Sequence, residues 1–84
     1  MNELDAALEP AARVVSRLVD TGVSAQVLEV MLRRGDVRTE MNAFWWTDYQ
    51  KKQLSAAAKA IGWEIHWMRW EGGHGWDIVK WEAI

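Results

Sequence analysis

The last quarter of the chain constrains the fold most, because it combines β-forming residues, a glycine-rich turn and most of the tryptophan. Residues 62–84 read GWEIHWMRWEGGHGWDIVKWEAI and contain five of the seven tryptophans. Two segments rich in β-formers, Trp63 to Glu71 and Gly75 to Glu82, are separated by Gly72, Gly73 and His74, which predicts an antiparallel hairpin. The question that this hairpin raises is where its large aromatic side chains lie.

The length of the turn determines which residues face each other across the two strands. With a three-residue turn, Glu71 pairs with Gly75 and Arg69 meets Asp77. The face expected to lie against the core then carries Trp67 opposite Val79, Ile65 opposite Trp81 and Trp63 opposite Ala83. The other face carries Trp70 opposite Trp76, Met68 opposite Ile78, His66 opposite Lys80 and Glu64 opposite Glu82. A turn with an even number of residues is the alternative, and it would separate Arg69 from Asp77.

The size and cysteine content of the chain limit how it can be stabilised. We expect one domain over residues 1–84, near the lower size limit for a hydrophobic core without covalent staples. Cysteine is absent, so no disulfide can contribute, and this fits a reducing compartment. We expect no secretory signal in the acidic segment MNELDAALEP, and no membrane span, because no segment approaches the roughly 20 apolar residues that a span needs. A cytoplasmic location is therefore expected.

Two helices are predicted in the first 35 residues. Apolar residues recur at helical spacing from Leu4 to Val19, and Pro10 either lies in the first turn or, as we prefer, kinks a longer helix. Gly22 is the expected C-cap. Ser24 is the expected N-cap of a second helix that ends at Gly35 and is buried around most of its circumference, with Glu29 exposed.

A third helix is predicted from a capping-box pair, Thr47 and Gln50, and should run from Asp48 to Gly62. Alternation between residues 37 and 43 indicates either a strand or an irregular segment. The expected fold class is α+β, with about three helices packed on a small antiparallel sheet that ends in the C-terminal tryptophan-rich β-hairpin.

The tryptophans have two interpretations. In one, helices cover both faces of the sheet and every tryptophan lies in the core. In the other, part of the cluster is exposed as a recognition surface, because Trp, Met and Arg are enriched at interface centres. Three consecutive aromatics, residues 44–46, cannot all point the same way, so at least one should face outward or pack at an edge. The predicted partner-binding residues are Trp70, Trp76, Met68, Ile78, His74, Trp45 and Trp46.

Signals for catalysis or metal binding are weak. The two histidines, His66 and His74, have no cysteine beside them, so a metal would need carboxylates such as Glu71 or Asp77. The serines have helical roles, and EGGHG lacks the Lys and Ser or Thr of a phosphate-binding loop. We therefore predict no catalytic residue, no metal, no cofactor and no enzymatic activity.

One segment, RLVDTGVSAQVLEVMLRRG at residues 17–35, resembles a helix-turn-helix DNA-binding unit. The resemblance implies a recognition helix that begins at Ser24 and exposes Ala25, Gln26 and Glu29, with cations at Arg33 and Arg34. It departs from the pattern at Leu18 and Thr21. The formal net charge of −2 also disfavours attraction to phosphates, so a nucleic-acid-binding regulator is the alternative function.

The preferred function is a non-catalytic protein-binding module. A small, acidic, cysteine-free chain with an aromatic surface is similar in kind to phage-encoded inhibitors of host defence, such as anti-CRISPR proteins, and this likeness implies that the chain blocks a large host complex. We expect a protein partner rather than nucleic acid or membrane, and a homodimer remains open.

Overall fold

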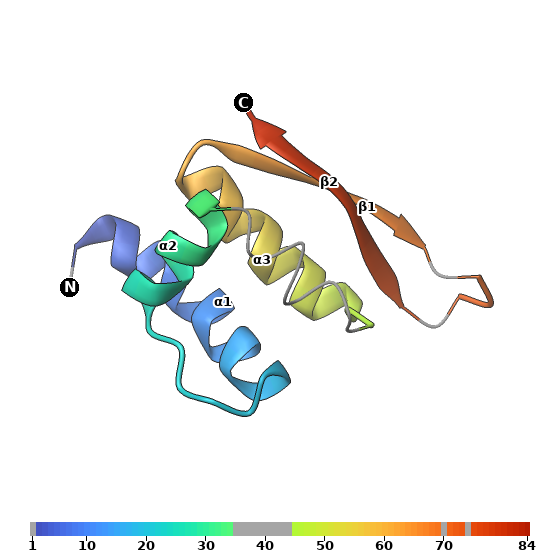
Figure 1. Ribbon diagram of the computed structural model, residues 1–84, viewed down its shortest axis with the longest axis horizontal. Coiled ribbons are helices and arrows are strands. Elements are labelled where there is room, and N and C mark those ends of the chain that lie inside the picture. The colour runs from blue at the N-terminus through green and yellow to red at the C-terminus, as the bar shows by residue number, and fades with distance from the viewer. Residues whose placement is uncertain (1, 35–44, 70, 74) are drawn as a thin grey trace.

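The computed structural model describes residues 2–34, 45–69, 71–73 and 75–84. Within these ranges the chain forms α1 (Glu3–Leu18), α2 (Ala25–Arg34), α3 (Asp48–Ala60), β1 (Trp63–Arg69) and β2 (Trp76–Ala83) (Figure 1). The two strands pair as an antiparallel hairpin, which confirms the predicted α+β class. The expected strand at 37–43 and the expected helix end at Gly35 lie outside the described residues, as do Phe44, Trp70 and His74.

Helix α1 covers nearly the whole of the apolar stripe and contains Pro10 in its interior, as the preferred longer helix requires. It begins at a cap that the stripe did not indicate, where Asn2 Oδ1 accepts a 2.7 Å hydrogen bond from the Asp5 amide. The predicted C-cap at Gly22 is wrong. The helix is capped by Val19, and Asp20 takes the left-handed conformation with φ of 52°. Aspartate tolerates this conformation better than most residues, so the chain can turn before it reaches the glycine.

The turn between α1 and α2 is fixed by two serines. The Ser16 hydroxyl donates to the Ala12 carbonyl over 2.7 Å and accepts from the Val23 amide over 2.8 Å. Ser24 caps α2 as predicted, because its hydroxyl accepts a 3.2 Å hydrogen bond from the Val27 amide. The second helix therefore begins where its local sequence indicates.

Helix α2 is buried along one stripe only, so the expected burial around most of its circumference is wrong. Its buried residues are Ala25, Leu28 and Leu32, whereas Val27 and Val30 are 48% and 50% exposed. Among the helices, α2 packs mainly against α1, and a single neighbour covers only one side of a helix.

Helix α3 lies between α1 and the hairpin and connects the layers of the molecule (Figure 1). Its predicted capping box is present: the Gln50 amide donates to Thr47 Oγ1 over 3.2 Å, and the Thr47 amide donates to Gln50 Oε1 over 3.0 Å. Alanines on one side of α3 allow its neighbours to approach closely.

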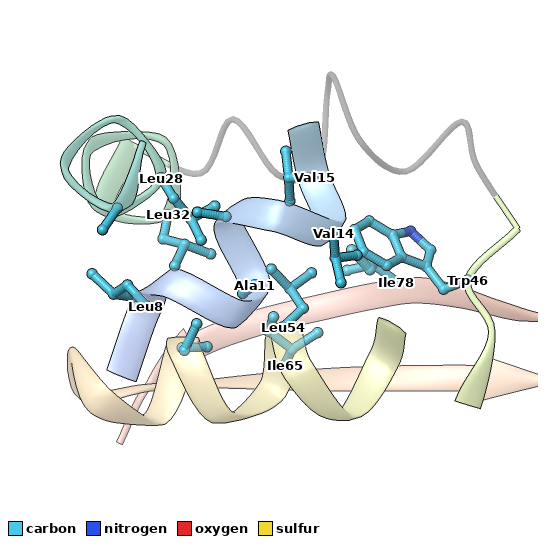
Figure 2. Close-up of a cluster of buried hydrophobic side chains, with 14 residues drawn as sticks. Leu8, Ala11, Val14, Val15, Leu28, Leu32, Trp46, Leu54, Ile65 and Ile78 are labelled. Atoms are coloured by element: carbon cyan, nitrogen blue, oxygen red, sulfur yellow. The ribbon is translucent and has the colours of Figure 1, made fainter. Parts of the chain in front are cut away.

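The hydrophobic core occupies the space that α1, α2, α3 and the inner face of the hairpin enclose (Figure 2). Trp46, just before α3, adds the largest fully buried side chain. None of the helices in the described ranges is long and apolar enough to cross a membrane. The buried residues are Leu8, Ala11, Ala12, Val14, Val15, Ala25, Leu28, Leu32, Trp46, Leu54, Ala57, Ala58, Ile65 and Ile78.

The predicted hairpin register is confirmed at the base and wrong toward the tip. Four pairs form as expected: Trp63 with Ala83, Glu64 with Glu82, Ile65 with Trp81 and His66 with Lys80. A β-bulge then inserts Val79 as an extra residue, so the next pairs are Trp67 with Ile78, Met68 with Asp77 and Arg69 with Trp76. The predicted pairing of Arg69 with Asp77 does not form.

The bulge has a physical cause in the pattern of burial. A regular strand would place Ile78 on the face opposite Trp67, whereas the extra residue brings Ile78 onto the same face, where it is 2% exposed. Trp76 moves to that face with it. The core thereby gains two large apolar side chains from β2. In return, the strand is locally distorted at the bulge.

Candidate protein-binding surface

The helices lie on one side of the hairpin, and its other side is free of helices in the described part of the chain (Figure 1). We call this uncovered side the open face. It is formed by the outward side chains of Glu64, His66, Met68, Asp77, Lys80 and Glu82. Val79, at the bulge between Ile78 and Lys80, is exposed as well.

Two of the predicted partner-binding residues lie in the core, which corrects the expectation that they are exposed. Ile78 belongs to the inner face of the hairpin, and Trp46 is fully buried. The Trp46 ring packs edge-on against Trp67, with ring centroids 5.7 Å apart and an interplanar angle of 66°. Trp70 and His74 fall outside the described residues, so their predicted role stays a prediction.

Trp76 is half-buried at the junction of β2 and α3. Its indole Nε1 donates a 2.6 Å hydrogen bond to Asp48 Oδ1, and the Lys51 ammonium lies 3.5 Å from its ring centroid. The Arg69 guanidinium lies 5.0 Å from the same ring. Both the polar edge and the face of Trp76 are therefore engaged within the chain.

Trp45 and Trp46 point in different directions, as expected for consecutive aromatics in extended chain. Trp46 forms an isolated antiparallel bridge with Trp76, with backbone hydrogen bonds of 3.2 and 2.8 Å. Trp45 is 57% exposed and its backbone passes close to Gly75. A Cβ at Gly75 would lie 3.1 Å from the Trp45 Cβ, so this glycine permits the close approach.

The base of the open face is a polar network. The Glu82 carboxylate lies 2.9 Å from His66 Nε2 and 3.2 Å from Lys80 Nζ. The hydrogen bond from Lys80, followed by that from His66, holds the pKa of Glu82 below its ordinary value. Lys80 is thus already paired with a carboxylate of the same chain.

The open face near the tip combines an apolar side chain with carboxylates. Met68 is 56% exposed beside Asp77, its cross-strand partner. A hollow of about 350 Å³ is lined by Met68, Arg69, Glu71 and Asp77. Glu71 and Asp77 form no ion pair with the described residues, because the Arg69 guanidinium turns to the Gly73 carbonyl at 2.8 Å and to Asp48 at 3.5 Å.

Val79, Glu71 and Asp77 were missing from the sequence-based site. One signal could have indicated them: the adjacent β-branched pair Ile78 and Val79 breaks the alternation of β2, and such a break is typical of a bulge. The sequence does not state which of the two residues is buried.

The predicted recognition helix presents few free groups. Ala25 is buried, and the Gln26 amide nitrogen donates to Asp5 Oδ2 over 2.9 Å. Glu29 pairs with Arg33 at 3.0 Å. The expected exposure of Ala25 is therefore wrong, and Gln26, Glu29 and Arg33 are each bound to a neighbour.

The described residues contain no group of three or more His, Cys, Asp or Glu side chains that could hold a metal ion. Comparison with protein-family models, with curated proteins and with solved structures finds no match.

Proposed function

We propose that the chain is a non-catalytic protein-binding module and that its partner binds the open face of the hairpin. The observation that carries the proposal is the exposure of Met68 on the open face, with Val79 also exposed at the bulge. Exposed apolar side chains that cluster on one face, rimmed by polar groups, are typical of contact surfaces, and methionine adapts its shape to a partner.

Trp45 enlarges this surface near the tip of the hairpin. Tryptophan provides a large contact area and is enriched among residues whose truncation weakens binding most. The proposed surface thus keeps Met68 and Trp45 from the predicted set and adds Val79. Trp46, Trp76 and Ile78 support the surface from beneath and are not proposed to touch the partner.

In its most specific form, the proposed function is that of a small phage-type inhibitor of a host defence complex, similar in kind to anti-CRISPR proteins. Its support is the small size, the acidic balance and the mixed apolar and charged open face. Such a protein would act by occupying a surface that the host complex needs, without chemistry of its own.

The test is a comparison of captured proteins. Tagged wild-type chain, Met68→Arg and Val30→Arg are incubated with a lysate of the natural host, and bound proteins are quantified by mass spectrometry. Val30 is a matched control, because it has a similar exposure on α2 and the substitution adds the same charge. We expect a protein that wild type and Val30→Arg retain and Met68→Arg loses. Equal capture by all three variants would refute the proposed surface.

A further inference from the structure

We infer that the hollow lined by Met68, Arg69, Glu71 and Asp77 receives an arginine side chain of the protein partner. The inference deepens the proposed function and rests on it. It identifies the partner by chemistry, as a protein with a basic patch from which one guanidinium projects.

The charge of the open face selects a cationic occupant. The exposed apolar residues of this face, Met68 and Val79, are surrounded by four carboxylates. These belong to Glu64, Glu71, Asp77 and Glu82, of which Glu82 pairs with Lys80. Arg69 also lines the hollow, but its guanidinium binds the Gly73 carbonyl and Asp48, so the tip of the face is acidic. A positively charged side chain would be attracted there, and a negatively charged or purely apolar one would leave the carboxylates poorly paired.

The β-bulge is what makes the Asp77 carboxylate available. Without it, Arg69 would face Asp77 and could neutralise it within the hairpin. With it, Arg69 lies opposite Trp76, and its guanidinium binds Gly73 and Asp48 on the other side. Asp77 instead lies beside Met68, without a basic partner in the described residues.

The shape and lining of the hollow favour arginine. Its volume of about 350 Å³ is at the low end of the roughly 300–1,000 Å³ of ligand pockets, which suits one side chain. Met68 offers an apolar wall for the methylene groups. Two carboxylates that line one hollow match the planar guanidinium, whose fork of donors can serve both, better than the compact ammonium of lysine.

The inference is tested by NMR with a defined probe, Nα-acetyl-arginine methylamide. The protein is labelled at the methionine methyl groups and the backbone amides. We expect a saturable shift of the Met68 methyl and of the Glu71 and Asp77 amides, with the Met31 methyl unchanged. The citrulline counterpart, which has the same shape and no charge, should produce no such shift, and the lysine counterpart should bind more weakly.

Substitutions provide the second arm. The double variant Glu71→Gln with Asp77→Asn should weaken the apparent Kd for the arginine probe about tenfold or more, as expected for the loss of charge-assisted hydrogen bonds. Glu3→Gln with Asp5→Asn removes the same charge from the first turn of α1 and should leave the Kd unchanged.

Three outcomes would overturn the assignment of arginine: an equal response to citrulline, an equal response to lysine, or shifts spread over all acidic residues. If these appear while Met68→Arg still abolishes protein capture, the open face binds its partner in another way. If capture does not depend on Met68, the proposed function fails whatever the probe shows. The two failures are thus distinguishable.

Discussion

The indole Nε1 of Trp76 donates a 2.6 Å hydrogen bond to Oδ1 of Asp48, which joins the first residue of β2 to the first turn of α3. The Lys51 ammonium covers the ring from the same helix. A tryptophan that the sequence suggested as a recognition residue therefore holds the hairpin against the helical layer.

We predict that Trp76→Phe lowers the free energy of unfolding by about 1 kcal/mol, because phenylalanine keeps a ring under Lys51 and loses the hydrogen bond to Asp48. Chemical denaturation measures the change. Trp63→Phe is the matched control, since Trp63 is half-buried and its indole N–H makes no hydrogen bond to the described residues. Equal losses in both variants would show that the bond to Asp48 contributes nothing.

Two adjacent tryptophans should differ sharply in their effect on stability. Trp46→Ala removes a fully buried ring that packs on Trp67 and should cost about 3–5 kcal/mol, enough to unfold a domain of this size. Trp45→Ala removes an exposed ring and should cost roughly 1 kcal/mol or less. Thermal melts of the two variants decide the matter, and similar melting temperatures would contradict the assignment of Trp46 to the core.

Local sequence signals located the helix starts well. Ser24 caps α2, and Thr47 with Gln50 caps α3, as predicted. Each cap depends on residues three positions apart, and that chemistry is contained in a short stretch of sequence. The left-handed turn at Asp20 was missed because glycine two residues later is the more common choice at such a turn.

The faces of the hairpin could be predicted only in part. The base follows from alternation, whereas the tip depends on which of Ile78 and Val79 finds a cavity to fill. Ile78 lies opposite Trp67 and in the same buried cluster as Trp46, which belongs to a segment distant in sequence. The exposure of Val27 and Val30 on α2 was missed for a related reason, because burial depends on how many elements pack around a helix.

Deletion of Val79 should preserve both faces of the hairpin. In that variant, Lys80 directly follows Ile78, and regular alternation keeps Ile78 and Trp76 on the inner face. Deletion of Asp77 makes Trp76 and Ile78 adjacent, so one of them must leave the core. We expect a clearly lower melting temperature for the second deletion, and NMR contacts between Trp67 and Ile78 in the first. The opposite order of stability would contradict the bulge.

The network at the base of the open face predicts a small pH dependence of stability. Because the pKa of Glu82 is lowered in the folded protein, its contribution is present above the ordinary pKa of a glutamate and is lost as the pH falls through the lowered value. Glu82→Gln should remove this part of the acid sensitivity. Carboxyl NMR titration checks the direction of the shift, and an ordinary pKa for Glu82 would refute it.

Sequence-selective binding to duplex DNA is not expected, because Gln26 and Glu29 on α2 are held by Asp5 and Arg33. Fluorescence anisotropy against a panel of labelled duplexes, at several salt concentrations, tests this. A salt-dependent preference for one sequence, lost in Gln26→Ala, would instead support the helix-turn-helix alternative.

The backbone bridge between Trp46 and Trp76 has a consequence for the order of folding. These two residues enclose α3, β1 and the hairpin turn, so their hydrogen bonds close a long loop. The entropic cost of that closure falls once the enclosed elements have formed, which makes the bridge a late contact. By the same reasoning it is among the first long-range contacts to be lost in partial unfolding. The tip of the hairpin would then separate from the start of α3, and Trp45 would no longer be held beside Gly75.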